Sequence, residues 1–150
     1  MENLGSILAF IGVGVMLFGS GTGSAIGTAM AGSAALGAMK RKDDAFGLYL
    51  VLTAVPGTQG LYGFGGFFLL LEKLQESLTV FQGSVILGAG LALGIVGLTS
   101  AMNQAKVCAS TIASIASGQD TFGKGLILVV FPELYAIVAF ASTFLMISLI

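Results

Sequence analysis

Glu133 is the residue of this sequence with the most distinctive chemistry, because it lies inside a long apolar stretch. The other six acidic residues lie at the start of the chain or between apolar stretches. A charged side chain in the interior of a bilayer costs at least ~2.5–3.5 kcal/mol, so it has a function or a partner. Two interpretations are open: a structural carboxyl group, protonated or paired with a cation such as Lys106, or an ion-binding site. Lys106 can instead extend its amine toward the membrane surface.

Neutral oxygen donors occur at a similar depth in two other apolar stretches. Thr58 and Gln59 follow Pro56, Tyr62 lies one helical turn further on, and Gln104 is the polar residue of the third stretch. Three neutral donors, Thr58, Gln59 and Gln104, together with one carboxylate can replace the hydration shell of a small hard cation, and one negative charge suits a monovalent ion. A proton needs only the carboxyl group and one hydrogen-bond partner. The extra oxygens therefore favour Na⁺ over H⁺.

The composition indicates that a membrane surrounds these residues. Of the 150 residues, 56% are hydrophobic and 9% are charged, and the mean hydropathy is +1.02. Such a chain cannot cover its surface with groups that face water. The lack of histidine excludes imidazole chemistry and the usual transition-metal sites, and the single cysteine, Cys108, excludes an internal disulfide. The net charge of −1 gives no sign of nucleic-acid binding.

Charged residues divide the chain into four apolar stretches, each longer than the roughly 20 residues that cross a bilayer. Backbone groups in lipid must be bonded within their own segment, which favours helices. We therefore expect an all-α membrane protein with four transmembrane helices, at about 4–39, 48–71, 81–117 and 125–150.

The loops between these stretches predict an orientation. Basic residues lie in the first loop at 40–42 and at the end of the third at Lys124. The opposite side carries Glu2, Glu72, Lys73 and Glu76. The positive-inside rule then places the first and third loops in the cytoplasm and both termini outside the cell membrane.

The chain matches itself without gaps at an offset of 76 residues. Shared apolar residues are expected by chance, so the informative matches are the Asp-x-Phe-Gly loops at 44–47 and 120–123 and the prolines Pro56 and Pro132. We predict two tandem copies of one helical hairpin, residues 1–76 and 77–150, which cross the membrane in the same direction. Glu133 aligns with Gly57, so only the second copy has the carboxylate.

Small residues dominate the first helix of each copy. Gly19, Gly23 and Gly27 lie one turn apart on one face, and Gly90 and Gly94 repeat the spacing. Such glycines either join the helices of one hairpin or crowd the first helices around the axis of an oligomer. The second helices carry bulky side chains suited to lipid contact: Phe64, Phe67, Phe68, Phe140 and Phe144. Small inner helices and bulky outer ones are what a ring of hairpins requires.

Pro56 and Pro132 are expected to interrupt the two second helices at equivalent points. Each lacks a backbone donor and frees the carbonyl one turn earlier, at Leu52 and Leu128 respectively.

Over its whole length the sequence resembles the proteolipid (c or K) subunit of prokaryotic V-type ATPases. The resemblance is carried by Pro-Gly-Thr-Gln-Gly-Leu-Tyr-Gly at 56–63, Gln-Ala-Lys-Val at 104–107 and Glu-Leu-Tyr-Ala at 133–136. It is greatest with the sodium-translocating branch of that family. The resemblance implies a homo-oligomeric ring that acts as the rotor of an ATPase or ATP synthase. Other subunits hydrolyse ATP, so this chain is not expected to be an enzyme by itself.

The resemblance also implies a ligand set for the ion. The family uses the glutamate of the fourth helix, the threonine and glutamine after the proline of the second, the glutamine of the third, and the carbonyl before that proline. In this chain these are Glu133, Thr58, Gln59, Gln104 and Val55. The role of the Val55 carbonyl follows from the resemblance alone, because the carbonyl that Pro56 leaves without a backbone donor is that of Leu52. The tyrosine that bonds the glutamate in this family corresponds to Tyr62.

The partners implied are a stator membrane subunit, whose arginine competes for Glu133, and central-stalk subunits at the loops 40–47 and 118–124. Three alternatives remain open at this point. They are a rotor proteolipid that carries H⁺, a small channel or secondary transporter lined by Glu133 and the glutamines, and a structural membrane assembly factor.

Overall fold

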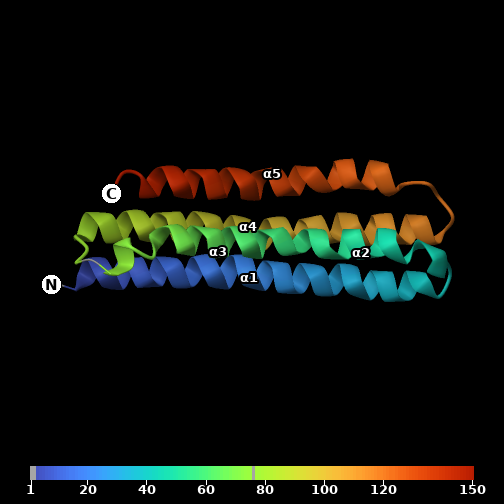
Figure 1. Ribbon diagram of the computed structural model, residues 1–150, viewed down its shortest axis with the longest axis horizontal. Helices are drawn as coiled ribbons and strands as arrows, with labels where there is room; N and C mark the ends of the chain where they lie inside the picture. Colours follow the sequence, from blue (N-terminus) through green and yellow to red (C-terminus); the bar gives the residue numbers. More distant parts are fainter. Residues whose placement is uncertain (1–2, 76) are drawn as a thin grey trace.

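The computed structural model describes residues 3–75 and 77–150, which form long helices lying side by side (Figure 1). The α-helices are α1 (Leu4–Met39), α2 (Phe46–Ala54), α3 (Thr58–Leu70), α4 (Val80–Ala116) and α5 (Phe122–Ile147). Short 3₁₀ turns, η1 (Asp43–Ala45), η2 (Val55–Gly57) and η3 (Lys73–Gln75), connect some of them. The prediction of an all-α chain is confirmed. Glu2 and Glu76, used above for the orientation, lie outside the described residues.

Among the described residues, α1, α4 and α5 are the helices long and apolar enough to cross a membrane. The stretch expected as one helix at 48–71 differs from the prediction. It begins two residues earlier, at Phe46, and η2 divides it into α2 and α3. Pro56 sits in this turn, where it has no N–H to donate and its ring crowds the carbonyl four residues earlier.

Pro132 lies within the continuous helix α5, so the prediction that both prolines interrupt their helices was wrong for Pro132. Side chains of α4 bond carbonyls on either side of this proline. The Gln104 amide donates to the Val129 carbonyl at 3.1 Å, and the Ser100 hydroxyl donates to the Pro132 carbonyl at 2.8 Å. These bonds hold α5 against α4 at the level of the proline.

The fourth helix spans Phe122–Ile147 and not 125–150, because the chain reverses sharply after α4. Gly118 has a φ of +87°, a conformation that glycine adopts at little cost. Its N–H bonds the Ile115 carbonyl and the next N–H bonds the Ser114 carbonyl, which closes the end of α4. The following helix can therefore begin after only a few residues.

Glycines bring α1 and α4, the first helices of the two hairpins, into close parallel contact. A Cβ atom added at Gly12 would lie 2.6 Å from the Ile86 carbonyl oxygen, and one added at Gly23 would lie 2.6 Å from the Leu98 Cα. The Ser20 hydroxyl also donates to the Leu93 carbonyl across this contact, at 3.2 Å. Gly12, Gly19 and Gly23 thus join the two hairpins to each other, and the interpretation of a contact within one hairpin was wrong for Gly19 and Gly23. Gly27 contacts both Pro56 of its own hairpin and Ala101 of α4.

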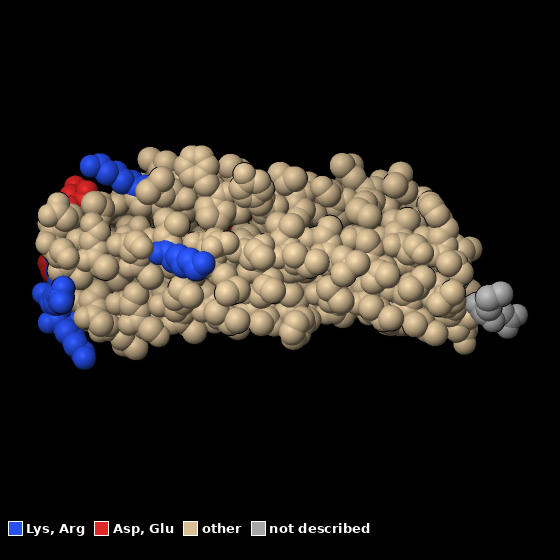
Figure 2. Space-filling view, turned by 180° about the vertical axis from the view of Figure 1, so that it is seen from behind, with Lys and Arg blue, Asp and Glu red and all other residues tan. Residues whose placement is uncertain are grey.

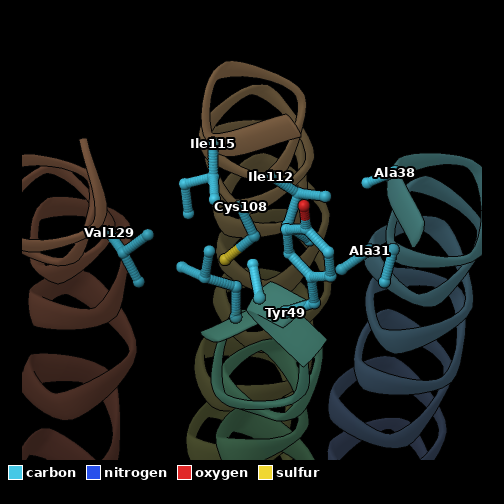
Figure 3. Packing of buried hydrophobic residues seen from close by; sticks show 10 residues of the cluster. Ala31, Ala38, Tyr49, Cys108, Ile112, Ile115 and Val129 are labelled. Carbon is cyan, nitrogen blue, oxygen red and sulfur yellow. The ribbon is translucent and has the colours of Figure 1, made fainter. Parts of the chain in front are cut away.

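Two clusters of buried apolar side chains connect the helices. One contains Tyr49 of α2, Ala31 of α1, Cys108 and Ile112 of α4, and Val129 of α5 (Figure 3). The other lies toward the opposite end of the helices and includes Ala9, Met16, Leu70, Ile86, Leu93 and Ala139. The stretch between the clusters contains the buried polar side chains described below.

The surface divides into a charged end and a long apolar flank. Charged side chains gather at the end that carries the 40–45 and 117–121 connections, and the flank is almost free of them (Figure 2). Phe64, Phe68 and Phe144 are exposed on the flank, as expected for lipid contact, whereas Phe67 and Phe140 are partly buried against the core. α1 begins and α5 ends at the opposite end (Figure 1), where Lys73 of η3 bonds the Ile150 carbonyl.

The α1–α4 contact predicts the effect of a single methyl group. Gly12→Ala places a Cβ against the α4 backbone, and such overpacking should cost about 1–3 kcal/mol. Gly37→Ala is the matched control, because nothing lies within 4 Å of the Cβ position at Gly37. The melting temperature of the detergent-extracted protein should fall for Gly12→Ala and hold or rise slightly for Gly37→Ala. Equal melting temperatures would contradict the close contact.

Candidate functional site

Glu133 is the twelfth of the 26 residues of α5, near the middle of that helix, and it is partly buried. Its carboxylate points toward α3 and α4. A carboxylate removed from water loses the hydrogen bonds that stabilise its charge, and neighbouring donors must replace them. The site can therefore be read from the donors that surround it.

Four side chains from α3 and α4 donate hydrogen bonds to this carboxylate. Oε2 accepts from Thr58 Oγ1 at 2.9 Å, from Gln59 Nε2 at 3.0 Å and from Gln104 Nε2 at 2.6 Å. Oε1 accepts from the Tyr62 hydroxyl. Polar residues proposed from sequence in three separate apolar stretches thus converge on one carboxyl group.

The 3₁₀ turn at Pro56 positions the donors of α3. Thr58 Oγ1 lies 3.0 Å from the Val55 carbonyl oxygen, within the same turn, so the hydroxyl is held near the backbone. Tyr62 follows one turn later on the same face, and its ring stacks on Phe140 of α5 with centroids 5.8 Å apart. The Val55 carbonyl therefore lies next to the Thr58 hydroxyl, which also bonds the carboxylate.

The two glutamine side chains are fully buried and bonded to each other. Gln59 Nε2 donates to Gln104 Oε1 at 2.9 Å, and Gln104 Nε2 donates to the Val129 carbonyl at 3.1 Å as well as to Glu133. Buried amide groups are costly unless they are bonded, so this network fixes the distance between α3, α4 and α5 at the site.

Ser100 is a member of this network that the sequence analysis missed. Its hydroxyl accepts from Gln59 Nε2 at 3.1 Å and donates to the Pro132 carbonyl at 2.8 Å. Two signals pointed to it: Ser100 lies one turn before Gln104 on α4, and its repeat partner is Ser24. The Ser24 hydroxyl bonds the Gly60 N–H at 2.7 Å in the first hairpin, so both serines bond α3 or α5.

Lys106 is not bonded to the carboxylate. Its side chain is exposed, and its amine donates to the Asn103 side chain at 3.0 Å. Lys106 therefore does not pair with Glu133.

The arrangement can coordinate a cation or hold a proton. The described residues contain no group of three or more His, Cys, Asp or Glu side chains that could hold a metal ion. What the site has is one carboxylate with hydroxyl and amide groups, which are oxygen donors of the type that hard monovalent or divalent cations take. A single negative charge favours a monovalent ion.

Comparison with known proteins finds one matching family and, separately, similar individual proteins. The sequence matches the family of ATP synthase C subunits twice, over residues 11–70 and 87–146. Each end of the second match lies 76 residues after the corresponding end of the first, in agreement with the internal offset.

Two curated proteins are similar over much of the chain. V-type sodium ATPase subunit K of Enterococcus hirae is 38% identical over 146 residues, which cover 97% of this chain and 94% of that protein. A-type ATP synthase subunit K of Methanocaldococcus jannaschii is 40% identical over 114 residues, which cover 76% of this chain and 51% of that protein.

The network predicts how much stability Gln104 provides. Gln104→Ala removes one of the four donors to the Glu133 carboxylate and the side-chain donor to the Val129 carbonyl, and should cost about 1–3 kcal/mol. Gln75→Ala is a matched control, since Gln75 is exposed and makes only a long bond of 3.4 Å to Leu71. Thermal melting in detergent should separate the two variants. If Gln104→Ala melts like Gln75→Ala, the buried bonds do not hold the helices together.

Proposed function

The chain belongs to the family of ATP synthase C subunits, and from this premise we propose that it is a rotor-ring subunit of a V-type rotary ATPase that carries Na⁺ at Glu133. As a proteolipid of this family it is an ion-translocating subunit, and the catalytic sites for ATP lie in other subunits. The observation that carries the proposal is the central carboxylate of α5, which faces three neutral side chains of α3 and α4.

In this proposal Na⁺ takes the place of the donated hydrogens around Glu133. A half-turn about the last torsion of Gln59 or Gln104 exchanges the amide nitrogen for the carbonyl oxygen. Each glutamine can then offer Oε1 to the cation, beside Glu133 Oε2, Thr58 Oγ1 and the Val55 carbonyl. The Thr58 hydroxyl, 2.9 Å from Glu133 and 3.0 Å from Val55, supports this set, since it links the two. Tyr62 holds the other carboxylate oxygen.

Binding a cation cancels the charge of the carboxylate, and this is the basis of the proposed transport cycle. A neutral site can pass through lipid as the ring turns, whereas a bare carboxylate there is costly. At the stator, an arginine from a neighbouring protein then competes for Glu133 and releases the ion. One monovalent ion that crosses 100 mV carries about 2.3 kcal/mol, so several ions must cross for each ATP made or hydrolysed.

The membrane arrangement belongs to the same proposal. The chain crosses the cell membrane four times, with α2 and α3 together as the second span, and both termini lie outside. The glycine-rich helices α1 and α4 face the inside of the ring, and the helices with exposed phenylalanines face lipid. The loops at 40–47 and 118–124 lie at the charged end of the molecule (Figure 2), which supports a cytoplasmic contact of this end with the central stalk.

A proton is the alternative cargo, because a protonated carboxyl group needs only one hydrogen-bond partner and the Tyr62 hydroxyl lies beside Glu133 Oε1. Carbodiimide modification of Glu133 separates the two ions. Sodium should slow the modification near neutral pH. Thr58→Ala or Gln104→Ala should raise the sodium concentration needed about tenfold, since a lost polar contact is worth ~1.5 kcal/mol. If saturating sodium has no effect and only pH changes the rate, the site carries protons.

Two further measurements separate the rotor from the remaining alternatives. Native mass measurement of the detergent-extracted protein should give a stable ring of many copies, whereas a small channel or secondary transporter predicts a monomer or dimer. Glu133→Gln should abolish ion transport by the assembled complex, because a neutral amide has no negative charge to bind and neutralise the cation. Transport that survives this substitution would instead support a structural assembly factor.

A further inference from the structure

Ser100 of α4 bonds two other helices with one hydroxyl group. The residue is only 6% exposed, and its Oγ donates to the Pro132 carbonyl of α5 at 2.8 Å and accepts from Gln59 Nε2 of α3 at 3.1 Å. Hydroxyl groups in helices commonly bond a carbonyl one turn earlier in their own helix. The residues of α4 that do so include Ser84, Thr99, Ser110 and Thr111. The bonds of Ser100 therefore serve the contact between helices at the site and not α4 alone.

The repeat partner of Ser100 makes a different bond. Ser24 lies 76 residues earlier, in the hairpin without the carboxylate, and its hydroxyl accepts from the backbone N–H of Gly60 at 2.7 Å. Ser100 lies in the hairpin that contains Glu133, and it bonds a glutamine of the proposed ligand set and the carbonyl directly before Glu133. The difference between these two equivalent serines thus coincides with the presence of the carboxylate.

The single hydrogen of the Ser100 hydroxyl determines how the Gln59 amide is oriented. The Pro132 carbonyl accepts this hydrogen. Toward Gln59 the Ser100 oxygen can therefore act only as an acceptor, which suits the amide nitrogen and repels the amide oxygen. Gln59 Oε1 is thereby directed to the other side, where it lies 3.4 Å from Thr58 Oγ1.

This orientation places Gln59 Oε1 among the other oxygens of the proposed ion site. Thr58 Oγ1 lies 3.4 Å from Gln59 Oε1, 3.0 Å from the Val55 carbonyl oxygen and 2.9 Å from Glu133 Oε2. Oxygens gathered in this way are the ligands that a hard cation takes. Gln59 can therefore offer Oε1 as it stands, without a half-turn of its amide.

Gln59 Nε2 has more acceptors than hydrogens. Its two hydrogens face three acceptors, which are Gln104 Oε1 at 2.9 Å, Glu133 Oε2 at 3.0 Å and Ser100 Oγ at 3.1 Å. A cation bound to Glu133 Oε2 repels the hydrogen that Gln59 donates there. Ser100 and Gln104 can then accept both hydrogens, so that no buried donor is left unpaired. Without Ser100, cation binding would carry the cost of an unpaired buried N–H.

We infer that Ser100 is a positioning residue that favours Na⁺ over H⁺ at Glu133. It directs Gln59 Oε1 toward the ion and accepts the hydrogen that the ion displaces from the carboxylate. A proton does not need Ser100, because a proton on Oε1, beside Tyr62, leaves the bond from Gln59 to Oε2 in place. The inference rests on the proposed function and deepens it by naming a residue outside the ligand set that sets the ion preference.

Carbodiimide modification of Glu133 in native membranes tests this role with two separate readouts. The first is the sodium concentration that halves the modification rate, and the second is the pH dependence of the rate without sodium. Ser100→Ala should raise this sodium concentration about fivefold, the effect of one lost hydrogen bond of ~1 kcal/mol. The pH dependence should stay as in the unsubstituted protein, because protonation does not require Ser100.

Two conservative variants separate the hydroxyl group from the volume of the side chain. Ser100→Cys keeps nearly the same volume but has only a weakly bonding sulfur, so it should also raise the sodium concentration. Ser100→Thr keeps the hydroxyl, and the groove of about 310 Å³ that Ser100 lines between α4 and α5 has room for the added methyl group. This variant should therefore behave like the unsubstituted protein.

Ser20→Ala is the matched control. Ser20 is fully buried and bonds another helix, but its bond goes to the Leu93 carbonyl and involves no residue of the site. This variant should keep the sodium concentration of the unsubstituted protein, whatever its melting temperature.

Two results would overturn the role of Ser100 and leave the rotor proposal standing. One is sodium protection that is unchanged in both Ser100→Ala and Ser100→Cys. The other is a Ser100→Ala variant that shifts the sodium and pH dependences together, or a Ser20→Ala variant with the same shift, since either would show a general effect on packing. Failure of sodium to protect the unsubstituted protein would contradict the sodium site itself, and with it this inference.

Discussion

A single carboxylate within apolar helices imposes the geometry of this protein. Glu133 needs donors that replace water, and they come from helices that are far apart in sequence: Thr58, Gln59 and Tyr62 on α3 and Gln104 on α4. α3, α4 and α5 must therefore meet at one depth and keep a fixed distance there. The 3₁₀ turn at Pro56 brings the Thr58 hydroxyl and the Val55 carbonyl to this depth as well.

The rest of the fold keeps those helices in place. The glycine contact lets α1 and α4 approach almost backbone to backbone, and the apolar clusters on both sides of the site hold α2, α3 and α5 against this pair. Close packing of small residues is the main attraction available between helices in lipid, because burial of apolar surface gives little there. Glycines and apolar side chains thus hold in place the helices that carry the polar site around Glu133.

Much of this could be predicted from sequence because polar groups are rare in it. A lone carboxylate and a few amides in apolar stretches have few possible partners other than each other, and the 76-residue offset added the hairpin pattern. Ser100 escaped notice because serine in a membrane helix commonly bonds its own backbone, as Ser84 and Ser110 do here. The two prolines did not give the same local structure, because Pro56 lies in a 3₁₀ turn between α2 and α3 whereas Pro132 lies within the continuous helix α5. The glycine spacing showed a contact face but not which helix covers it.

Equilibrium binding of radioactive sodium to the purified protein tests the central claim most directly. We expect one Na⁺ bound per chain, because each chain has one carboxylate at the centre of its helices. We also expect this binding to be lost in Glu133→Asp, whose shorter side chain cannot reach the donors of α3 and α4. The absence of saturable sodium binding, or binding that persists unchanged in this variant, would contradict the claim that Na⁺ binds at Glu133 and neutralises its carboxylate.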